Sequence, residues 1–479
     1  MAELMARLLA FPPDKKNISP KEYDTKAREY VKDLWKLSEK DLNKEVDKKN
    51  VLELLNPAVN SIAYAAALYI QLDLNSKNKQ KSAQLTELLA IFLSEFDPIQ
   101  VRFIGETWHS LFLTAANAVE QGAFDFSLLV SALLRLDPTA GTFTDLHLEL
   151  VRLALAKGVS SQVLPILDKD IYAFPQKSVK NVQEDFLSEE HEFSNAYITE
   201  KSGFTDKLSS DNVLEYYLLG AHIYIGRRDF SRARLFLEYV LLSPTQAHSA
   251  SALQVEAYKK WVLIGLLSEG RPLPLPKTFD QVIVKNIRAL AKMYDSLADS
   301  FEKRDYRKFE AEMQMGEAVW EDDGNIRLVT EASSALLRFR VIDLQKTYAA
   351  LPVSRVSHLI DLPADTTAQL LTDMISRGYL NASIASSGAG AVLRFHDTLS
   401  YPTAAVDGDL ESHTARVQAL VGFVRDADYR LQLTKEYVDT MKRAKRQGPD
   451  SDLAEAMDLS WEQPMVPDDE DGDEDIMGP

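Results

Sequence analysis

Apolar residues recur at intervals of three and four positions along most of this chain, from about residue 23 to residue 325. This spacing places them on one face of an α-helix, where they can be buried together. One such segment carries apolar side chains at Leu85, Leu88, Leu89, Ile91 and Phe92. Strand-like alternation is scarce over the same range, and Gly or Pro separates the segments. The pattern therefore predicts a fold dominated by α-helices that are joined as hairpins.

A short motif repeats inside this helical region. The sequence Gly-x-x-Asp-Phe-Ser begins at Gly122 and again at Gly226, each time followed by an apolar helical segment and a Pro, and a degraded copy begins at Glu302. We expect one helix to end here, the chain to turn at the Gly, and the Asp to cap the next helix. Helix pairs of this kind bury their apolar faces on their neighbours, so the motif favours a TPR-like α-solenoid. Chance recurrence of so short a motif is the alternative.

Two segments interrupt the helical pattern. Residues 174–212 are polar and mixed in charge, which predicts a long loop with one short helix at most. The segment "GRPLPLPKTF", which begins at Gly270, contains three Pro within five residues. Because Pro lacks a backbone N–H and fixes φ, no helix can run through that segment, and we expect a rigid connector there.

Residues 352–397 change the pattern to helix, helix, strand, turn and strand, which is the order of a winged helix. A strong amphipathic helix over residues 327–351 precedes it. The second helix of the winged helix has Asp365 or Thr366 as its N-cap and ends at Gly378. The segments "YLNASI" and "AVLRF" alternate as two paired strands, and "ASSGAGA" between them reads as a flexible wing.

A last helix is predicted from residue 411 to residue 447. Its apolar residues form two rows with a spacing of seven, one containing Val417, Val424, Leu431 and Val438 and the other containing Leu420, Ala427, Thr434 and Met441. The two rows form a heptad seam over more than three repeats, the pattern of a helix that packs along other helices. Twelve Asp or Glu and no Lys or Arg follow it up to residue 479, so residues 448–479 are predicted to be a disordered acidic tail.

The sequence offers little for catalysis. The absence of Cys excludes disulfides, thiolate zinc sites and cysteine catalysis. No HExxH, GxxxxGK[ST] or GxSxG pattern occurs, and no two of the eight His lie within five residues of each other. A zinc site assembled from distant His stays open as an alternative. Asp322 and Asp323 read as a solvated connector rather than as paired catalytic carboxylates. We therefore expect no enzyme activity, no cofactor and no metal.

Membrane and nucleic-acid partners are not expected either. No run of about 18 apolar residues occurs, and the N-terminus lacks the pattern of a signal peptide. The formal net charge is −18, of which the tail contributes twelve. The second winged-helix helix offers Asp365, Gln369 and Asp373 but only Arg377 as a base, which suits a phosphate backbone poorly. We therefore predict a protein partner.

That protein partner is expected at two places. One is an open sheet edge, at which a strand from another chain can pair, formed by Val392, Leu393, Arg394 and Phe395. The other is the heptad seam, with Val417, Leu420, Val424, Ala427, Leu431, Val438 and Met441 as its binding residues.

A helical solenoid that leads into a winged helix and then a long helix resembles the PCI domain proteins. These are subunits of the proteasome lid, the COP9 signalosome and translation initiation factor three. Within residues 144–397, several separated blocks resemble, in the same order, the third-subunit family of the COP9 signalosome. They are "TDLHLELVRLALAKGVSSQVLPILDKDI", "YYLLGAHIYIGRRDFSRARLFLEYVLLSP", "VEAYKKWVLIGLLSEG", "NASI" and "RFHD".

The resemblance implies a domain plan. It comprises N-terminal helical repeats over residues 1–205, a helical-repeat half (206–328) and a winged-helix half (329–400) of the PCI domain, a bundle helix (411–447) and the tail (448–479). It also implies a non-catalytic scaffold in the cytoplasm and nucleus. The COP9 signalosome removes the ubiquitin-like modifier Nedd from cullins through a zinc isopeptidase on another subunit. Expected partners are the other subunits, through winged helices and a C-terminal bundle, and indirectly cullin-RING ligases. A scaffold subunit of the proteasome regulatory-particle lid is the alternative.

Overall fold

The computed structural model describes the chain with a few gaps. The described residues are 2–13, 18–37, 42–43, 45–46, 49–75, 78–176, 186–244, 249–387, 390–396, 403–432, 437–438 and 440–443. They belong to two units, residues 1–396 and residues 397–479, and each is a body of its own. The predicted acidic tail, residues 448–479, lies outside the described residues, as do residues 433–436, 439 and 444–447 of the predicted last helix, Thr434 of the predicted heptad rows among them.

The first unit is built mainly from helices. Its N-terminal helices are α1 (Ala2–Leu8), α2 (Pro20–Leu34), α4 (Val51–Leu54), α5 (Ser61–Leu74), α6 (Lys79–Glu95), α7 (Pro98–Val101), α8 (Gly105–Glu120), α9 (Ser127–Leu136), α10 (Asp145–Lys157) and α11 (Leu164–Leu167), with a small hairpin of β1 (Glu45–Val46) and β2 (Lys49–Asn50). After a 3-10 turn, η2 (Ser194–Ala196), come α12 (Ser210–Gly226), α13 (Phe230–Leu242), α14 (Ala252–Ser268), α15 (Gln281–Leu290), α16 (Lys292–Glu302), α17 (Tyr306–Met315), α18 (Glu317–Asp322) and α19 (Ile326–Gln345).

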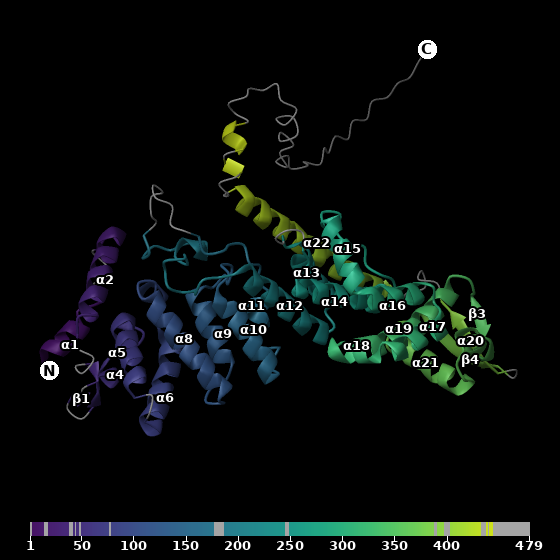
Figure 1. Cartoon of the computed structure of the whole chain (residues 1–479), viewed down its shortest axis with the longest axis horizontal. Helices are drawn as coiled ribbons and strands as arrows, with labels where there is room; N and C mark the ends of the chain where they lie inside the picture. Colours follow the sequence, from purple (N-terminus) through teal and green to yellow (C-terminus); the bar gives the residue numbers. More distant parts are fainter. Residues whose placement is uncertain are drawn as a thin grey trace, which may run out of the picture. The chain divides into compact units, whose positions relative to one another are not determined.

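These helices stack in sequence order, which confirms the predicted α-solenoid. Helix α5 packs on α6, α8 on α10, α10 on α12, and α12 on both α13 and α14, and the series continues through α16 and α17 to α19 (Figure 1). One continuous apolar core runs between them from Leu8 to Leu336. Aromatic side chains fill the joints between repeats: Phe96, Trp108 and Phe204 form one such group, with ring centroids 5.7 to 5.9 Å apart.

The repeated motif caps helices as expected in two of its three copies. Asp229 accepts a hydrogen bond from the Arg232 N–H at the start of α13, and Asp305 accepts one from the Lys308 N–H at the start of α17. The prediction that the chain turns at Gly226 is wrong. Gly226 still belongs to α12, and the left-handed residue is Arg228, with φ 65°.

The long loop before α12 is packed against the helices. Its residues Tyr197, Ile198 and Phe204 are buried, and Gly203 approaches the start of α8. A Cβ at Gly203 would lie 2.5 Å from the Glu106 nitrogen, and φ there is +79°. Only glycine permits this approach, so the loop residues that follow Gly203 are held over α8.

The winged helix follows α19 and is completed by a three-stranded antiparallel sheet. Its elements are β3 (Ala350–Pro352), α20 (Val353–Ile360), α21 (Ala364–Ser376), β4 (Ala382–Ser387) and β5 (Gly390–Phe395). The strand order is β3-β5-β4. Pairing of β4 with β5 extends to Ser387 and Gly390, so most of the predicted flexible wing is strand, and only residues 388–389 separate the two strands.

Helix α19 contributes to two separate cores. Val329, Ala332 and Leu336 face the core of the repeats, whereas Val341 belongs to a second core together with α20, α21 and the sheet. The predicted division at residues 328/329 assigns all but the first three residues of this helix to the winged-helix half. In the structure the change from one core to the other falls inside the helix, between Leu336 and Val341.

The second unit contains helix α22 (Thr403–Gln432). The predicted start at residue 411 is wrong by eight residues, because the chain is already helical at Thr403 despite Gly408 within this stretch. Residues 437–438 and 440–443 are also helical. Among the described helices of the chain, none is sufficiently long and apolar to cross a membrane.

Candidate functional site

The predicted open sheet edge is the central strand of the sheet. Residues Val392, Leu393 and Arg394 of β5 pair with β3 on one side and with β4 on the other. Their backbone groups are therefore already used within the sheet, and the prediction that this strand offers an open edge is wrong. The side chains also differ in access: Leu393 is fully buried, Val392 and Phe395 are half-buried, and Arg394 is exposed.

The free edge with a regular backbone is β4. Asn381 accepts a hydrogen bond from the His396 N–H, so the residues of β4 that bond to β5 are Ser383 and Ala385. The backbone groups of Ala382 and Ile384 then point away from β5, where a further strand can pair. The other edge strand, β3, has three residues and ends in Pro352, which lacks a donor.

The heptad residues lie on an exposed face of α22. Val417, Leu420, Val424 and Leu431 are 53 to 61% exposed, and Ala427 is exposed as well. Val438 is exposed and Met441 is half-buried, both in the short helical pieces that follow α22.

The earlier start of α22 extends the same row by one heptad. Leu410 stands seven residues before Val417 and is 63% exposed, while Val421 and Phe423 widen the apolar face. We call the residues Leu410, Val417, Leu420, Val421, Phe423, Val424 and Leu431 the α22 stripe. Sequence analysis missed Leu410 because it placed this residue before the helix.

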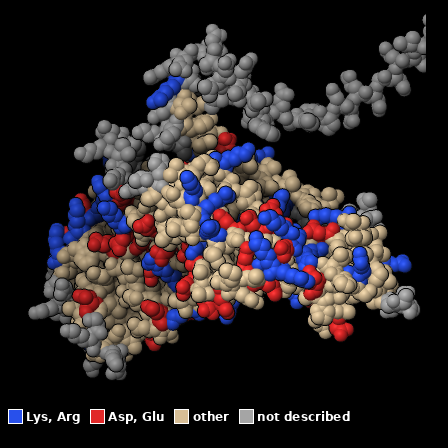
Figure 2. Space-filling view, turned by 45° about the vertical axis from the view of Figure 1, so that its right-hand side comes forward, with Lys and Arg blue, Asp and Glu red and all other residues tan. Residues whose placement is uncertain are grey.

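Two arginines in the described part of the winged-helix region, Arg377 and Arg338, are engaged by neighbouring side chains. Arg377, the residue after α21, pairs with Asp373 at 2.8 Å, which neutralises the single base predicted for this helix. The Arg338 guanidinium lies over the Tyr379 ring at 4.8 Å. On the face of the molecule in Figure 2, Lys and Arg are interspersed with Asp and Glu rather than gathered into one basic surface. A gathered basic surface is the footprint of a nucleic-acid-binding face, and the face in Figure 2 does not show one.

Two arginines contact the end of α20: Arg340 of α19, which is mostly buried, and Arg307 of α17, which is exposed. The Arg340 guanidinium of α19 donates to the Ile360 and Leu359 carbonyls at the end of α20, at 3.0 and 2.6 Å. Asp361 follows in the left-handed region, with φ 60°, and its carboxylate pairs with Arg307 of α17 at 3.1 Å. These contacts fix the direction in which β4 faces relative to the last repeats.

Asp323 is partly buried in a polar network, and the prediction of a solvated connector is wrong for it. Its carboxylate accepts from the Lys259 ammonium at 2.6 Å and from the Tyr294 hydroxyl at 2.8 Å. Next to it, the Lys260 ammonium donates to the Asn325 amide oxygen at 2.9 Å, and the Asn325 amide donates to Tyr294 at 2.8 Å. The network joins α14, α16 and the start of α19, so its role is structural.

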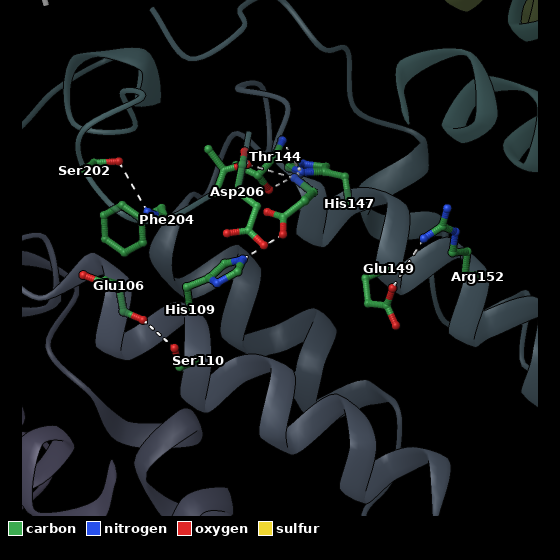
Figure 3. Close-up of polar contacts among 12 residues, drawn as sticks. Glu106, His109, Ser110, Thr144, His147, Glu149, Arg152, Ser202, Phe204 and Asp206 are labelled. Carbon is green, nitrogen blue, oxygen red and sulfur yellow. Dashed lines mark hydrogen bonds and ion pairs between the residues drawn. The ribbon is translucent and has the colours of Figure 1, made fainter. Parts of the chain in front are cut away.

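One group of side chains has the composition of a metal site. His109 of α8, Asp145 at the start of α10, and Asp206 in the loop before α12 place their ligand atoms within 4.8 Å of one another. His109 Nε2 and Asp145 Oδ2 are 2.8 Å apart, and Figure 3 shows Asp206 beside His109. Burial lowers the pKa of His109, but the hydrogen bond to Asp145 and the nearby carboxylates raise it more, above its usual value.

His147 of α10, two residues after Asp145, is a histidine with a purely structural role. His147 Nδ1 accepts a hydrogen bond from the Thr144 N–H at 3.2 Å, and its Nε2 lies 3.3 Å from the Ala140 carbonyl. Burial lowers the pKa of His147, so the ring is neutral and closes the capping box of α10. All its ring atoms are used within the fold, unlike those of the Asp145 carboxylate, whose Oδ1 is buried without a partner.

Comparison with known proteins gives a consistent family. Residues 25–283 match the model of the family described as "COP9 signalosome complex subunit 3, N-terminal helical repeats". A protein of Emericella nidulans named COP9 signalosome complex subunit 3 is 34% identical over 370 residues, which covers 74% of each chain. A protein of the same name from Neurospora crassa is 29% identical over 461 residues, which covers 91% of each.

Proposed function

The chain belongs to the COP9 signalosome subunit 3 family, and from this premise we propose that it is a non-catalytic scaffold subunit of a COP9 signalosome. The α22 stripe is the observation that carries this proposal. The solenoid adds to it, because stacked repeats offer a long surface on which other chains can be placed. Neither feature performs chemistry, and both serve assembly.

The α22 stripe leaves apolar side chains exposed that would stabilise the protein if another chain covered them. Full burial of a Leu or Val side chain contributes about 1.5–3 kcal/mol. Val417, Val424 and Leu431 are each more than half exposed, so most of this free energy is not realised within the chain. Helices in proteins derive most of their stability from packing of an apolar face. We infer that helices of other subunits cover the stripe as in a coiled-coil bundle.

The β4 edge is the proposed contact for a neighbouring winged helix. The outward backbone groups of Ala382 and Ile384 suit pairing with a strand of another PCI subunit. This assignment takes the place of the pairing predicted for residues 392–395, whose backbone is used inside the sheet.

The wider role is proposed from the family. The partners would be the other signalosome subunits and, through them, cullin-RING ligases, and the assembly would remove Nedd from cullins with the isopeptidase of another subunit. Cytoplasm and nucleus are the proposed locations. A lid subunit of the proteasome regulatory particle is the weaker candidate, because the two relatives described above carry the signalosome name.

Affinity purification of the tagged full chain from its own cells, followed by native mass spectrometry, tests the assembly. Recovery of several subunits together with a zinc isopeptidase that cleaves modified cullin is the expected result. Recovery of proteasome ATPases and lid subunits would favour the alternative. Recovery of the chain alone would contradict both proposals.

The stripe is tested by Val424→Asp, which places a charge among side chains that the bundle would bury. A buried, unpaired carboxylate costs several kcal/mol. Because Val424 is 61% exposed in the chain, the variant should fold normally and yet recover at least tenfold less of its partners. Gln418→Asp on the same helix but outside the stripe is the matched control and should assemble normally. Equal recovery by both variants would show that the stripe is not the interface.

A further inference from the structure

The chain contains a three-residue cluster for which neither the solenoid nor the proposed scaffold role has a use. His109, Asp145 and Asp206 come from three separate segments, and two of them carry negative charge within 4.8 Å of each other. The His109 side chain is 7% exposed and the Asp145 side chain is 20% exposed. Two carboxylates at this separation favour a cation beside them, which is either the imidazolium form of His109 or a bound ion.

The imidazole alone satisfies only part of the cluster. His109 Nε2 lies 2.8 Å from Asp145 Oδ2, but Asp145 Oδ1 is buried without a hydrogen-bond partner. Burial of a carboxylate oxygen without a partner is costly. The site therefore contains a buried acceptor, an imidazole nitrogen and a second carboxylate, all of which a metal ion could engage at once.

The spacing also suits a metal. Zinc binds His nitrogen and carboxylate oxygen at about 2.0–2.2 Å, which in a tetrahedral site places the ligand atoms about 3.4 Å apart. The separations in the cluster extend from 2.8 Å to at most 4.8 Å, a range that includes that value. The three ligand atoms are therefore close enough together to share one ion.

We propose that His109, Asp145 and Asp206 form a binding site for one divalent cation of the zinc class. The His nitrogen favours zinc and related first-row metals over Mg²⁺ and Ca²⁺, which prefer sets of oxygen ligands. Three protein ligands leave one tetrahedral position for water. The ion joins α8, α10 and the loop before α12, so it fastens the long loop onto the solenoid.

The surroundings of the cluster support both formation of the site and access to it. The contact of Gly203 with the start of α8 brings the following loop residues over His109. The Asp145 N–H donates to the Thr205 hydroxyl at 3.2 Å, which fixes the residue before Asp206. Asp206 and Thr205 line a cavity of about 460 Å³, through which an ion can reach the cluster. The proposal is independent of the scaffold role, because its residues lie outside both proposed interfaces.

The test uses the full chain, freed of metal with a chelator, and Zn²⁺ alone as the titrant in isothermal calorimetry. We expect one Zn²⁺ to bind each chain tightly, with Mg²⁺ at the same concentration producing no corresponding step. The key variant is Asp206→Asn, because Asp206 is exposed and its change leaves the buried His109–Asp145 pair in place. Asp211→Asn, which removes an exposed carboxylate from the first turn of α12, is the matched control.

Loss of a ligand should weaken Zn²⁺ binding by about 100-fold or more, since even changing a group that only orients a ligand costs 10–100-fold. The control should bind as the unchanged chain does. Zn²⁺ should also raise the melting temperature of the unchanged chain but not that of Asp206→Asn. The proposal is overturned if Zn²⁺ does not bind, or if Asp206→Asn binds it as tightly as the control.

Discussion

Replacing Asn325 by Ala should destabilise the chain by about 3 kcal/mol, although no apolar contact of note is lost. Asn325 is fully buried and accepts the hydrogen bond of the Lys260 ammonium, whose side chain is 8% exposed. The nearest other acceptor is Glu256, at 3.5 Å. Burial lowers the pKa of Lys260, so the surroundings disfavour the charged ammonium even with its partners present.

The magnitude follows from what each change leaves behind. A hydrogen bond to a charged group contributes about 1.5–3 kcal/mol, and a buried charge without its partner costs more. Lys260→Met removes the charge but leaves the Asn325 oxygen without a donor, at a cost of about 2 kcal/mol. In the double variant neither an orphaned charge nor an orphaned amide remains. Its destabilisation should therefore be smaller than the sum of the two single effects by at least about 1 kcal/mol.

Urea denaturation of the four proteins in this cycle measures the effect, with tryptophan fluorescence as the signal. Trp261 and Trp320 are buried on the same helices or next to them, so they report local loosening. Asn117→Ala, an exposed change on α8, is the control and should shift the free energy of unfolding by less than about 0.5 kcal/mol. Additive single effects, or an Asn325→Ala variant no less stable than the control, would refute the reasoning.

Three further changes probe other parts of the fold. Gly203→Ala should lower the free energy of unfolding in urea by at least about 2 kcal/mol, because the new Cβ lies 2.5 Å from a backbone nitrogen of α8. Gly158→Ala is the control: its φ is +69° but a Cβ there meets open space, so it should cost about 1 kcal/mol. Similar losses for the two variants would contradict the close contact at Gly203. Arg340→Ala should speed hydrogen exchange in the sheet while leaving α12 to α14 unchanged, and uniform protection would argue against its role as a clamp. Burial raises the pKa of Asp295, so just above the ordinary carboxyl range the folded state binds more protons than the unfolded state and loses stability as pH rises. Asp295→Asn should therefore be more stable than the unchanged chain at pH 7 but not at pH 4. A variant that is less stable at both pH values would show that the hydrogen bond from Tyr258 needs the charged carboxylate.

Much of the architecture was accessible from the sequence because helical periodicity is a local property. The solenoid, the winged helix and the apolar row on the last helix all follow from residues close together in the chain. The start of α22 was missed because Gly408 lies inside its first turns, and glycine ordinarily argues against a helix interior.

The sheet order was not accessible in the same way. Strand β3 has three residues, too few to show alternation, and Pro352 counts against a strand. Without β3 the sheet has only two strands, and β5 then looks like an edge. The residues that decide the outcome, Leu351 and Leu393, are 42 positions apart and show no common pattern.

The polar clusters could not be predicted from the sequence for a related reason. Asp323 reads as solvated in its own segment, and only Lys259 and Tyr294 from other helices give it partners. His109 and Asp206 are likewise 97 positions apart. Spacing motifs detect metal ligands only when these lie on one helix or hairpin, so a site assembled from three repeats leaves no signature in the sequence.

The length of helix α19 determines how the winged helix is oriented relative to the repeats. An α-helix advances about 1.5 Å and turns about 100° for each residue. Because one unbroken helix enters the first core at Val329 and the second at Val341, inserting or deleting a single residue between Leu336 and Val341 would swing β4 by roughly that angle. The number of residues between the two cores therefore sets the orientation of β4 relative to the last repeats.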